Sequence, residues 1–153
     1  MKKDGIISAV IEIQKGSNLK YEFDNKTRKL RLDRILKKGF RYPGDYGFIP
    51  KTLDDDGDPL DIIILSRNSV KPMTKVKAKV IGLIKMLDDS LEDDKIIAAY
   101  DSEKTINKIP KQDINNLKKF FANYKGKKCR IISILGKEDA YKEIEYCKML
   151  YRK

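Results

Sequence analysis

Residues Lys75–Leu87 read KVKAKVIGLIKML, and this stretch carries the clearest structural signal in the chain. In its first half, Val76, Ala78 and Val80 alternate with lysines, which is the pattern of a strand with one buried face. The second half becomes apolar, and Gly82 between the halves suits a bulge or a sharp bend of a barrel strand. The stretch therefore predicts a long strand with a break in its regular pairing near Gly82.

Other strands are predicted on both sides of this stretch, and two helices are predicted near the C-terminus. The strand segments are 7–13, 19–24, 28–34, 60–65, 95–100 and 128–135. Apolar residues recur at helical spacing in residues 112–124, with Gly126 as a stop, and in residues 138–151. Many strands followed by late helices indicate a mainly β fold, in which a closed antiparallel barrel carries two peripheral helices.

Length and composition favour a single domain over residues 1–153. A chain of 153 residues can bury a core without disulfides or structural metals. No segment approaches about eighteen uninterrupted apolar residues, so no membrane partner is expected. Glu12 interrupts the apolar start of the chain, which argues against a secretory signal. Cys129 and Cys147 lack metal-type or redox-type spacing and are expected to be reduced thiols in a cytoplasmic protein.

The chain contains no histidine, which excludes several mechanisms. A Ser-His-Asp arrangement and an imidazole-ligated zinc centre are both impossible, so carboxylates, tyrosine, lysine or metal-activated water must handle protons. The formal charge is +11, yet five aspartates gather in residues 54–61, and four aspartates with Glu92 gather in residues 88–94. Two acidic clusters in a basic protein suggest cation sites inside a field that attracts phosphate.

The strongest chemical signal is the stretch Asp56-Gly57-Asp58-Pro59-Leu60-Asp61. Its three carboxylates repel one another, and they run directly into the apolar residues 62–64. Carboxylates gathered at the edge of a core need a compensating cation. The alternative interpretation is an Asp-rich, solvated turn.

The second acidic cluster lies between two predicted strands, at a mouth of the barrel. Asp88 and Asp93 can complete an oxygen-rich site with Asp56 and Asp61, and such a site suits Mg2+ or Mn2+ better than zinc. Lys95 adds a cation beside these acids. Taken alone, this cluster would be an ordinary charged loop.

Phosphate-binding donors are also predicted. Tyr42 and Tyr46 lie four residues apart across a Pro-Gly turn, and their hydroxyls can donate to phosphate oxygens. The same pattern also occurs in turns with core aromatics. Tyr124 with Lys125 at a helix end is either a further donor pair or a helix cap.

The early strands supply charged candidates. Lys20 and Glu22 share one strand face, and Arg34 follows on the next strand. These residues could instead form a surface pair. Together with the acidic clusters, the donors compose a phosphoryl-transfer site, which works by positioning and charge neutralisation. The chain has neither a P-loop nor a dinucleotide fingerprint, so the predicted substrate has no nucleotide handle.

From Glu12 to Lys125, the order and spacing of these residues resemble a soluble family I inorganic pyrophosphatase. Residues 56–61 match the Asp-rich motif of that family at every defining position. The resemblance implies an antiparallel barrel of the OB type, hydrolysis of inorganic pyrophosphate to two orthophosphates, and three or four Mg2+ ions per site. It also implies a homo-oligomer, a hexamer by default. The segment around 101–112 is shorter than in familiar bacterial members, and histidines near the first helix are missing, which affects the oligomer and not the catalytic assignment.

The resemblance also assigns residue roles. The implied metal ligands are Asp56, Asp61, Asp88 and Asp93. Asp58 is implied as the general base for a metal-activated water that attacks in line. The implied substrate-binding group is Lys20, Glu22, Arg34, Tyr46, Lys95, Tyr124 and Lys125. Glu12 at the cavity edge and Tyr42 are implied to support the site.

Two alternatives to this function stay open. A nucleic-acid-binding barrel without catalysis would fit the net charge, although aspartates beside the polar aromatics would repel a phosphate backbone unless metals are bound. A metal-dependent hydrolase acting on another phosphate substrate, such as tripolyphosphate or a nucleotide, would share the same residues. The main prediction is therefore a Mg2+-dependent diphosphatase without a nucleic-acid partner.

Overall fold

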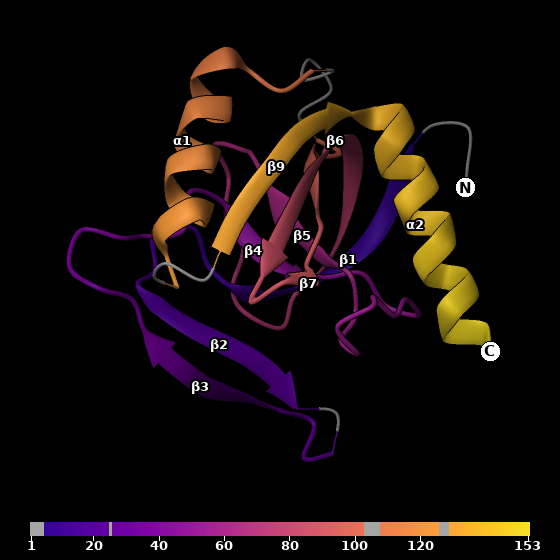
Figure 1. Ribbon diagram of the computed structural model, residues 1–153. Helices are drawn as coiled ribbons and strands as arrows, with labels where there is room; N and C mark the ends of the chain where they lie inside the picture. The colour runs from indigo at the N-terminus through magenta and orange to yellow at the C-terminus, as the bar shows by residue number, and fades with distance from the viewer. Residues whose placement is uncertain (1–4, 25, 103–107, 126–128) are drawn as a thin grey trace.

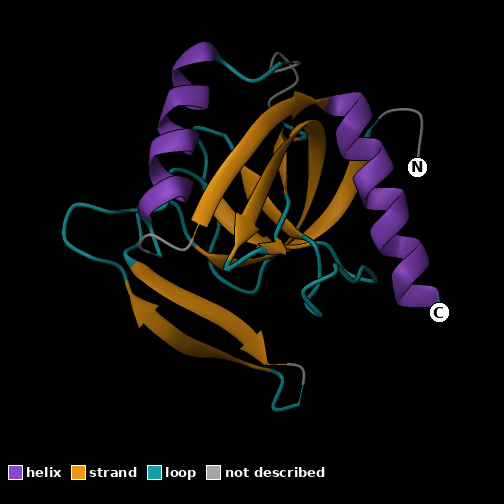
Figure 2. Cartoon of the chain, in the orientation of Figure 1, coloured by secondary structure: helices purple, strands orange, loops and turns teal. Residues whose placement is uncertain are grey.

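The computed structural model shows a mainly β chain with both helices near the C-terminus, and it describes residues 5–24, 26–102, 108–125 and 129–153 (Figures 1 and 2). The strands are β1 (Ile6–Ile13), β2 (Leu19–Asp24), β3 (Lys29–Ile35), β4 (Asp45–Phe48), β5 (Asp61–Ile64), β6 (Lys75–Asp88), β7 (Leu91–Glu92), β8 (Lys95–Tyr100) and β9 (Cys129–Gly136). The helices are α1 (Lys111–Asn123) and α2 (Lys137–Arg152). The predicted fold class is confirmed.

The barrel is organised around β6, the long strand predicted over residues 75–87. Its first half pairs with β1, where Lys75 lies opposite Val10. Its second half pairs with β9, where Gly82 lies opposite Gly136. Along its other edge it pairs with β8. Since β1 also pairs with β4 and β4 with β5, the hydrogen-bonded order β1-β4-β5-β8-β6 closes back onto β1.

Gly82 lies where the pairing of β6 changes. The register between β6 and β8 shifts between Val80 and Gly82. A Cβ atom on Gly82 would lie 2.5 Å from Ile109 Cδ1 and 2.7 Å from the Leu135 carbonyl oxygen. Glycine is therefore required here because β9 crosses too close for any side chain.

One pairing differs from the predicted antiparallel barrel. Strands β5 and β8 are parallel, with Asp61 opposite Lys95 and Ile64 opposite Ala98. The chain leaves β5, runs back along β6 and then enters β8 between the two, so it passes through β5 and β8 in the same direction. This crossover brings the starts of β5 and β8 to the same end of the barrel, and the two acidic clusters precede those starts.

Both helices pack on the outside of the barrel and flank β9 (Figure 1). Helix α1 buries Leu117, Phe120 and Phe121, and α2 buries Ala140, Ile144 and Cys147. Two clusters of buried residues result, one under each helix. Tyr151, which the helical spacing places on the apolar stripe of residues 138–151, is instead 53% exposed. No helix within the described ranges is long and apolar enough to cross a membrane.

Strands β2 and β3 form a separate hairpin beside the barrel (Figure 1). The Phe23 amide donates to Glu12 Oε2 of β1 at 2.7 Å, and the Phe23 ring stacks on Phe48 of β4 with centroids 5.9 Å apart. These contacts tie the hairpin to the barrel wall. The predicted connection between the two strands includes residue 25, which lies outside the described residues.

Strand β4 was not predicted, because residues 41–50 were interpreted as a Pro-Gly turn. Asp45–Phe48 is only four residues long and includes Gly47. A Cβ on Gly47 would lie 1.9 Å from the Val10 carbonyl oxygen, so the glycine allows β1 to lie against β4. The helix stop predicted at Gly126 lies outside the described residues.

Candidate active site

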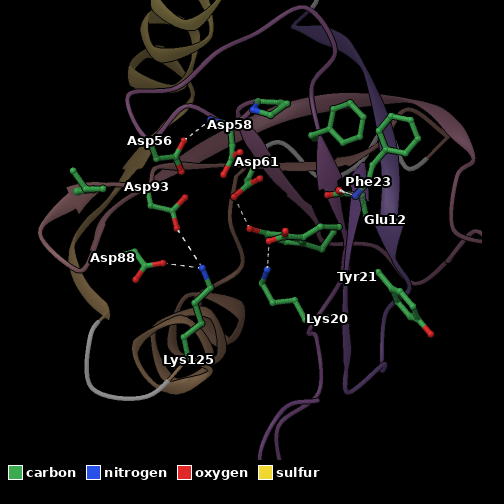
Figure 3. A pocket seen from close by; sticks show the side chains of 15 residues that line it. Glu12, Lys20, Tyr21, Phe23, Asp56, Asp58, Asp61, Asp88, Asp93 and Lys125 are labelled. Atoms are coloured by element: carbon green, nitrogen blue, oxygen red, sulfur yellow. Dashed lines mark hydrogen bonds and ion pairs between the residues drawn. The ribbon is translucent and has the colours of Figure 1, made fainter. Parts of the chain in front are cut away.

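The two acidic clusters meet at one end of the barrel around a cavity of about 280 Å³ (Figure 3). The cavity is lined by Glu12, Lys20, Tyr21, Glu22, Phe23, Tyr46, Phe48, Asp56, Asp58, Pro59, Asp61, Asp88, Leu91, Asp93 and Lys125. Most of the predicted site residues are in this set, although they come from five strands and three connections. The parallel register of β5 and β8 explains the meeting, since it places Asp61 beside Lys95.

The Asp-rich motif forms a tight turn before β5. Asp56 Oδ1 accepts a hydrogen bond from the Asp58 amide at 3.0 Å, and Gly57 has a φ of 87° that favours glycine. The turn leaves Asp58 exposed and Asp56 partly buried. Both side chains project toward Asp61 and Asp93 (Figure 3).

Lys95 is the most deeply buried of the described lysines around the site, with no exposed surface. Its ammonium lies 3.0 Å from Asp61 Oδ2 and 3.1 Å from Asp93 Oδ2, so it bridges the two acidic clusters. Tyr46 also donates to Asp61 Oδ2, at 2.7 Å. One Asp61 oxygen therefore already accepts hydrogen bonds from two protein side chains. Lys95 contacts acids that line the cavity but does not line it itself.

Lys125 contacts the second acidic cluster from the cavity wall. Its ammonium lies 2.8 Å from Asp88 Oδ2 and 4.0 Å from Asp93 Oδ2 (Figure 3). The neighbouring Asp94 turns away, because its buried carboxylate pairs with Lys85 at 3.1 Å and accepts the Met86 amide. Adjacent aspartates thus have different environments, and only Asp93 lines the cavity.

The hairpin contributes Lys20 and Glu22 to the cavity wall. The Lys20 ammonium lies 2.7 Å from Glu22 Oε1 and 3.1 Å from Asp33 Oδ2. Asp33 was not among the predicted site residues. Lys20 pairs with Arg34 and Tyr21 with Leu32, so Asp33 is the extra residue of an irregularity in β3. A bulge in a strand cannot be recognised from its apolar alternation alone.

Arg34 is not brought into the cavity. Its side chain is 46% exposed, and its Nε lies 3.5 Å from Asp33 Oδ2. Arg34 lies opposite Lys20 in the hairpin but does not line the cavity, so its role in substrate binding stays a prediction.

A cluster of aromatic rings supports the cavity from below. The ring of Tyr42 lies 5.2 Å from that of Tyr46 and 6.2 Å from that of Tyr124, between centroids. The hydroxyls of Tyr42 and Tyr124 are buried, and neither has a hydrogen-bond partner among the described residues. Both tyrosines contribute to the core and do not line the cavity, whereas Tyr46 does.

Burial and mutual repulsion shift the pKa values of the acids. Burial raises the pKa of Glu12 to about 8 and that of Asp56 to about 6. Burial, with Asp61 nearby, also raises the pKa of Asp58. Burial opposes ionisation of Asp93 as well, but Lys95 and Lys125 outweigh it and lower the pKa of that carboxyl.

The composition of the cavity lining tests whether the site fits divalent cations. Five aspartates and two glutamates line one cavity together with only two lysines, so acidic side chains outnumber the cations of the lining. All of the free ligand atoms are carboxylate oxygens, which Mg2+ prefers. The donor set therefore fits oxygen-ligated divalent cations, with Asp56, Asp61, Asp88 and Asp93 best placed to hold them.

Comparison with known proteins identifies what the chain is similar to. The profile of the family described as inorganic pyrophosphatase matches residues 9–152. A soluble inorganic pyrophosphatase of Oryza sativa subsp. indica is 38% identical, across 95% of this chain and 72% of the relative. Soluble inorganic pyrophosphatase 2 of Chlamydomonas reinhardtii is 40% identical, across 95% of this chain and 81% of the relative.

Solved structures give the same result for the fold. An inorganic pyrophosphatase from Neisseria gonorrhoeae superposes with a TM-score of 0.92 at 34% identity, covering 98% of this chain and 93% of that one. The enzyme from Thermus thermophilus also gives a TM-score of 0.92 at 34% identity, covering 100% of this chain and 95% of that one. The similarity therefore includes both the barrel and the loops around the cavity.

Proposed function

Since the chain belongs to the inorganic pyrophosphatase family, we propose that its acidic cavity is the site where inorganic pyrophosphate is hydrolysed with Mg2+ as cofactor. Family membership makes the chain an inorganic diphosphatase, a hydrolase of the phosphoanhydride bond. The observation that supports the assignment to this cavity is the convergence of Asp56, Asp58, Asp61, Asp88 and Asp93 on one cavity, with Lys20 and Lys125 on its walls.

The acids and cations divide into two groups by position. Asp56, Asp61, Asp88 and Asp93 would hold Mg2+, which when bound screens the charge of pyrophosphate and acidifies a coordinated water. Lys20 and Lys125 line the walls, where their ammonium groups can contact the terminal oxygens of the two phosphates. As negative charge moves onto the departing phosphate, these preorganised lysines would stabilise it.

Lys95 and Tyr46 would hold Asp61 in one orientation. Both donate to the same Asp61 oxygen, which leaves the other oxygen to face the cavity. Tyr42 and Tyr124 would support the site from below the cavity as further hydrogen-bond donors. Their buried hydroxyls have no hydrogen-bond partner among the described residues.

Asp58 would be the general base. It is an exposed acid of the Asp-rich turn that lines the cavity, and burial with the neighbouring Asp61 raises its pKa above the ordinary value. A more basic carboxylate accepts a proton more readily from an attacking water. The proton moves to Asp58, the water oxygen bonds to one phosphorus, and the other phosphate leaves with the bridging oxygen.

Phosphate release from pyrophosphate in the presence of Mg2+ tests the proposal. Asp58→Asn is expected to lower kcat by at least about a hundredfold, the usual contribution of a positioned acid or base. Asp61→Asn is expected to lower activity by a similar factor, because it removes a carboxylate that would hold Mg2+. Asp55→Asn is the control, because Asp55 is an exposed neighbour of the same charge outside the cavity lining. An unsubstituted protein that releases no phosphate would refute the assignment.

The predictions on assembly and compartment extend this proposal. The family resemblance supports a homo-oligomer with a hexamer as the first choice, cytoplasmic localisation, a single domain and no nucleic-acid partner. Light scattering of the purified protein would measure the oligomer, and competition by tripolyphosphate or nucleotides would separate pyrophosphate from other phosphate substrates.

A further inference from the structure

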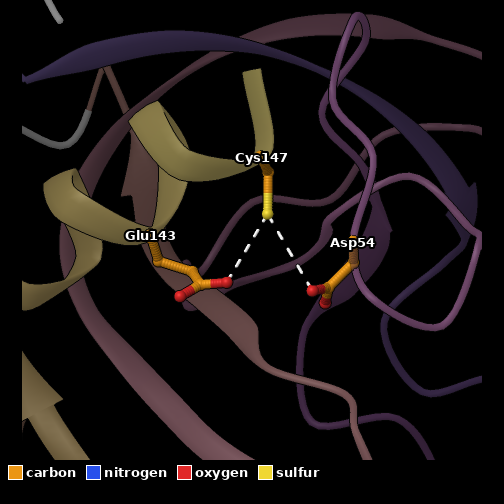
Figure 4. A group of neighbouring side chains, drawn as sticks. All are labelled: Asp54, Glu143 and Cys147. Atoms are coloured by element: carbon orange, nitrogen blue, oxygen red, sulfur yellow. Dashed lines mark hydrogen bonds between the residues drawn. The ribbon is translucent and has the colours of Figure 1, made fainter. Parts of the chain in front are cut away.

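A second group of titratable side chains lies behind the Asp-rich turn, outside the cavity lining. It consists of Asp54, at the start of the turn, with Glu143 and Cys147 of α2 (Figure 4). Asp54 is 4% exposed and Cys147 is fully buried. The mechanism proposed above uses none of the three residues.

The main chain of Asp54 closes the turn that carries the site acids. Its amide donates to the Asp58 carbonyl at 2.7 Å, and its carbonyl accepts from the Gly57 amide at 3.0 Å. Both hydrogen bonds span the segment that presents Asp56 and Asp58. The orientation of these two acids therefore depends on where Asp54 is held.

The side chain of Asp54 is held by α2. The Cys147 thiol lies 3.9 Å from Asp54 Oδ1, and it also lies 3.5 Å from Glu143 Oε1 (Figure 4). The same Asp54 oxygen accepts the Asp55 amide at 2.8 Å. One residue before, the Leu53 amide donates to the Cys147 carbonyl at 3.0 Å. Main chain and side chain of Cys147 thus both contact the start of the turn.

We propose that Asp54 is a positioning residue, whose buried carboxyl, held against Cys147 of α2, fixes the turn 54–58 and so sets the affinity of Asp56 for Mg2+. This inference rests on the function proposed above. The group itself is a poor Mg2+ site, because a thiol is a soft ligand and Mg2+ prefers oxygen. Its contribution therefore passes through the turn.

Asp55 provides a matched control in the same turn. It is the same residue type and is the next residue in the chain, but it is exposed, and its partner Tyr146, at 3.0 Å from Oδ1, is 39% exposed. An exposed hydrogen bond of this kind contributes little, whereas a buried one fixes its neighbours. Loss of a carboxyl group at any position of this turn would affect the Asp54 and Asp55 variants alike.

The first experiment measures amide hydrogen exchange in the metal-free protein. In Asp54→Ala, the amides of residues 54–58 are expected to exchange about tenfold faster, since the local opening of the turn costs less free energy. Asp55→Ala is expected to change them less than about twofold. Equal rates in the two variants would overturn the proposal, and this readout does not depend on pyrophosphatase activity.

The second experiment measures Mg2+ binding by calorimetry and turnover at saturating Mg2+. Asp54→Ala is expected to weaken Mg2+ binding about tenfold, with kcat at saturating Mg2+ within about twofold of the unsubstituted protein. Asp54→Asn, which keeps the acceptor for the Asp55 amide, is expected to bind Mg2+ as the unsubstituted protein does. If Asp54→Ala fails to fold, Cys147→Ala, which removes the thiol in contact with the Asp54 carboxyl, replaces it and is expected to weaken Mg2+ binding. Unchanged Mg2+ affinity in folded Asp54→Ala would refute the role.

The two proposals fail in different ways. An unsubstituted protein that binds no Mg2+ and releases no phosphate would refute the function of the cavity, and the exchange rates would still report whether Asp54 holds the turn. Normal activity with an unperturbed turn in Asp54→Ala would refute only the positioning role.

Discussion

At the scale of single residues, the cavity contains more negative charge than the described lysines compensate. Among these acids Glu12 is also buried: it is 8% exposed, and burial raises its pKa to about 8. A folded-state pKa above the unfolded value means that the folded state holds the proton more tightly. The stability that Glu12 contributes is then complete below about pH 4.5 and is lost as the pH rises through about 8.

Glu12→Gln is therefore expected to change the pH dependence of stability in the metal-free protein. The glutamine keeps an acceptor for the Phe23 amide and has no proton to lose. At pH 9 the variant should be more stable than the unsubstituted protein by a few kcal/mol, and at pH 4 the two should agree. Urea unfolding at the two pH values measures the difference, and parallel pH profiles of the two proteins would contradict it.

At the scale of elements, the packing of β6 against β9 requires that residue 82 has no side chain. Gly82→Ala would place a methyl group 2.7 Å from the Leu135 carbonyl oxygen of β9, and backbone can give way less than a side chain. Overpacking of this kind typically costs about 1–3 kcal/mol, so Tm is expected to fall by several degrees. Gly136, directly opposite, is the control, because a Cβ there meets nothing within 4 Å of described atoms. Equal melting temperatures of the two alanine variants would disprove the close approach.

The same element shows what the sequence could and could not predict. The alternation in residues 75–87 and Gly82 were enough to predict β6 and its irregularity, because both are local patterns. The parallel pairing of β5 with β8 is a contact between distant segments, and no local pattern specifies it. Strand β4 escaped prediction because four residues behind a Pro-Gly turn carry too short an alternation.

The same distinction between local patterns and contacts of distant segments applies to the site. The Asp-rich motif and its neighbours predicted most of the cavity lining, since the family resemblance fixes spacing. The contact of Asp33 with Lys20 was not predicted, because it arises at an irregularity in β3 that depends on hydrogen bonding between strands. The sequence does not predict the position of Asp54 against α2, because its partner Cys147 is far along the chain.

At the scale of the whole molecule, a net charge of +11 surrounds a cavity lined by carboxylates. The positive field would attract pyrophosphate, and the attraction weakens as salt shortens the screening length. The value of kcat/KM is therefore expected to fall several-fold between about 20 mM and 200 mM KCl, with little change in kcat. Steady-state kinetics at constant free Mg2+ checks this, and a salt-independent kcat/KM would rule out steering.

The parallel pairing of β5 with β8 also has a consequence for the order in which the protein folds. Asp56 and Asp61 leave the ribosome before Asp88 and Asp93, and the two pairs meet only after β6 has run back and β8 has inserted beside β5. Contacts between such distant segments form late, when the cost of closing the intervening loop has been met. The cation site is thus among the last parts to assemble, and Mg2+ should slow unfolding much more than it speeds refolding.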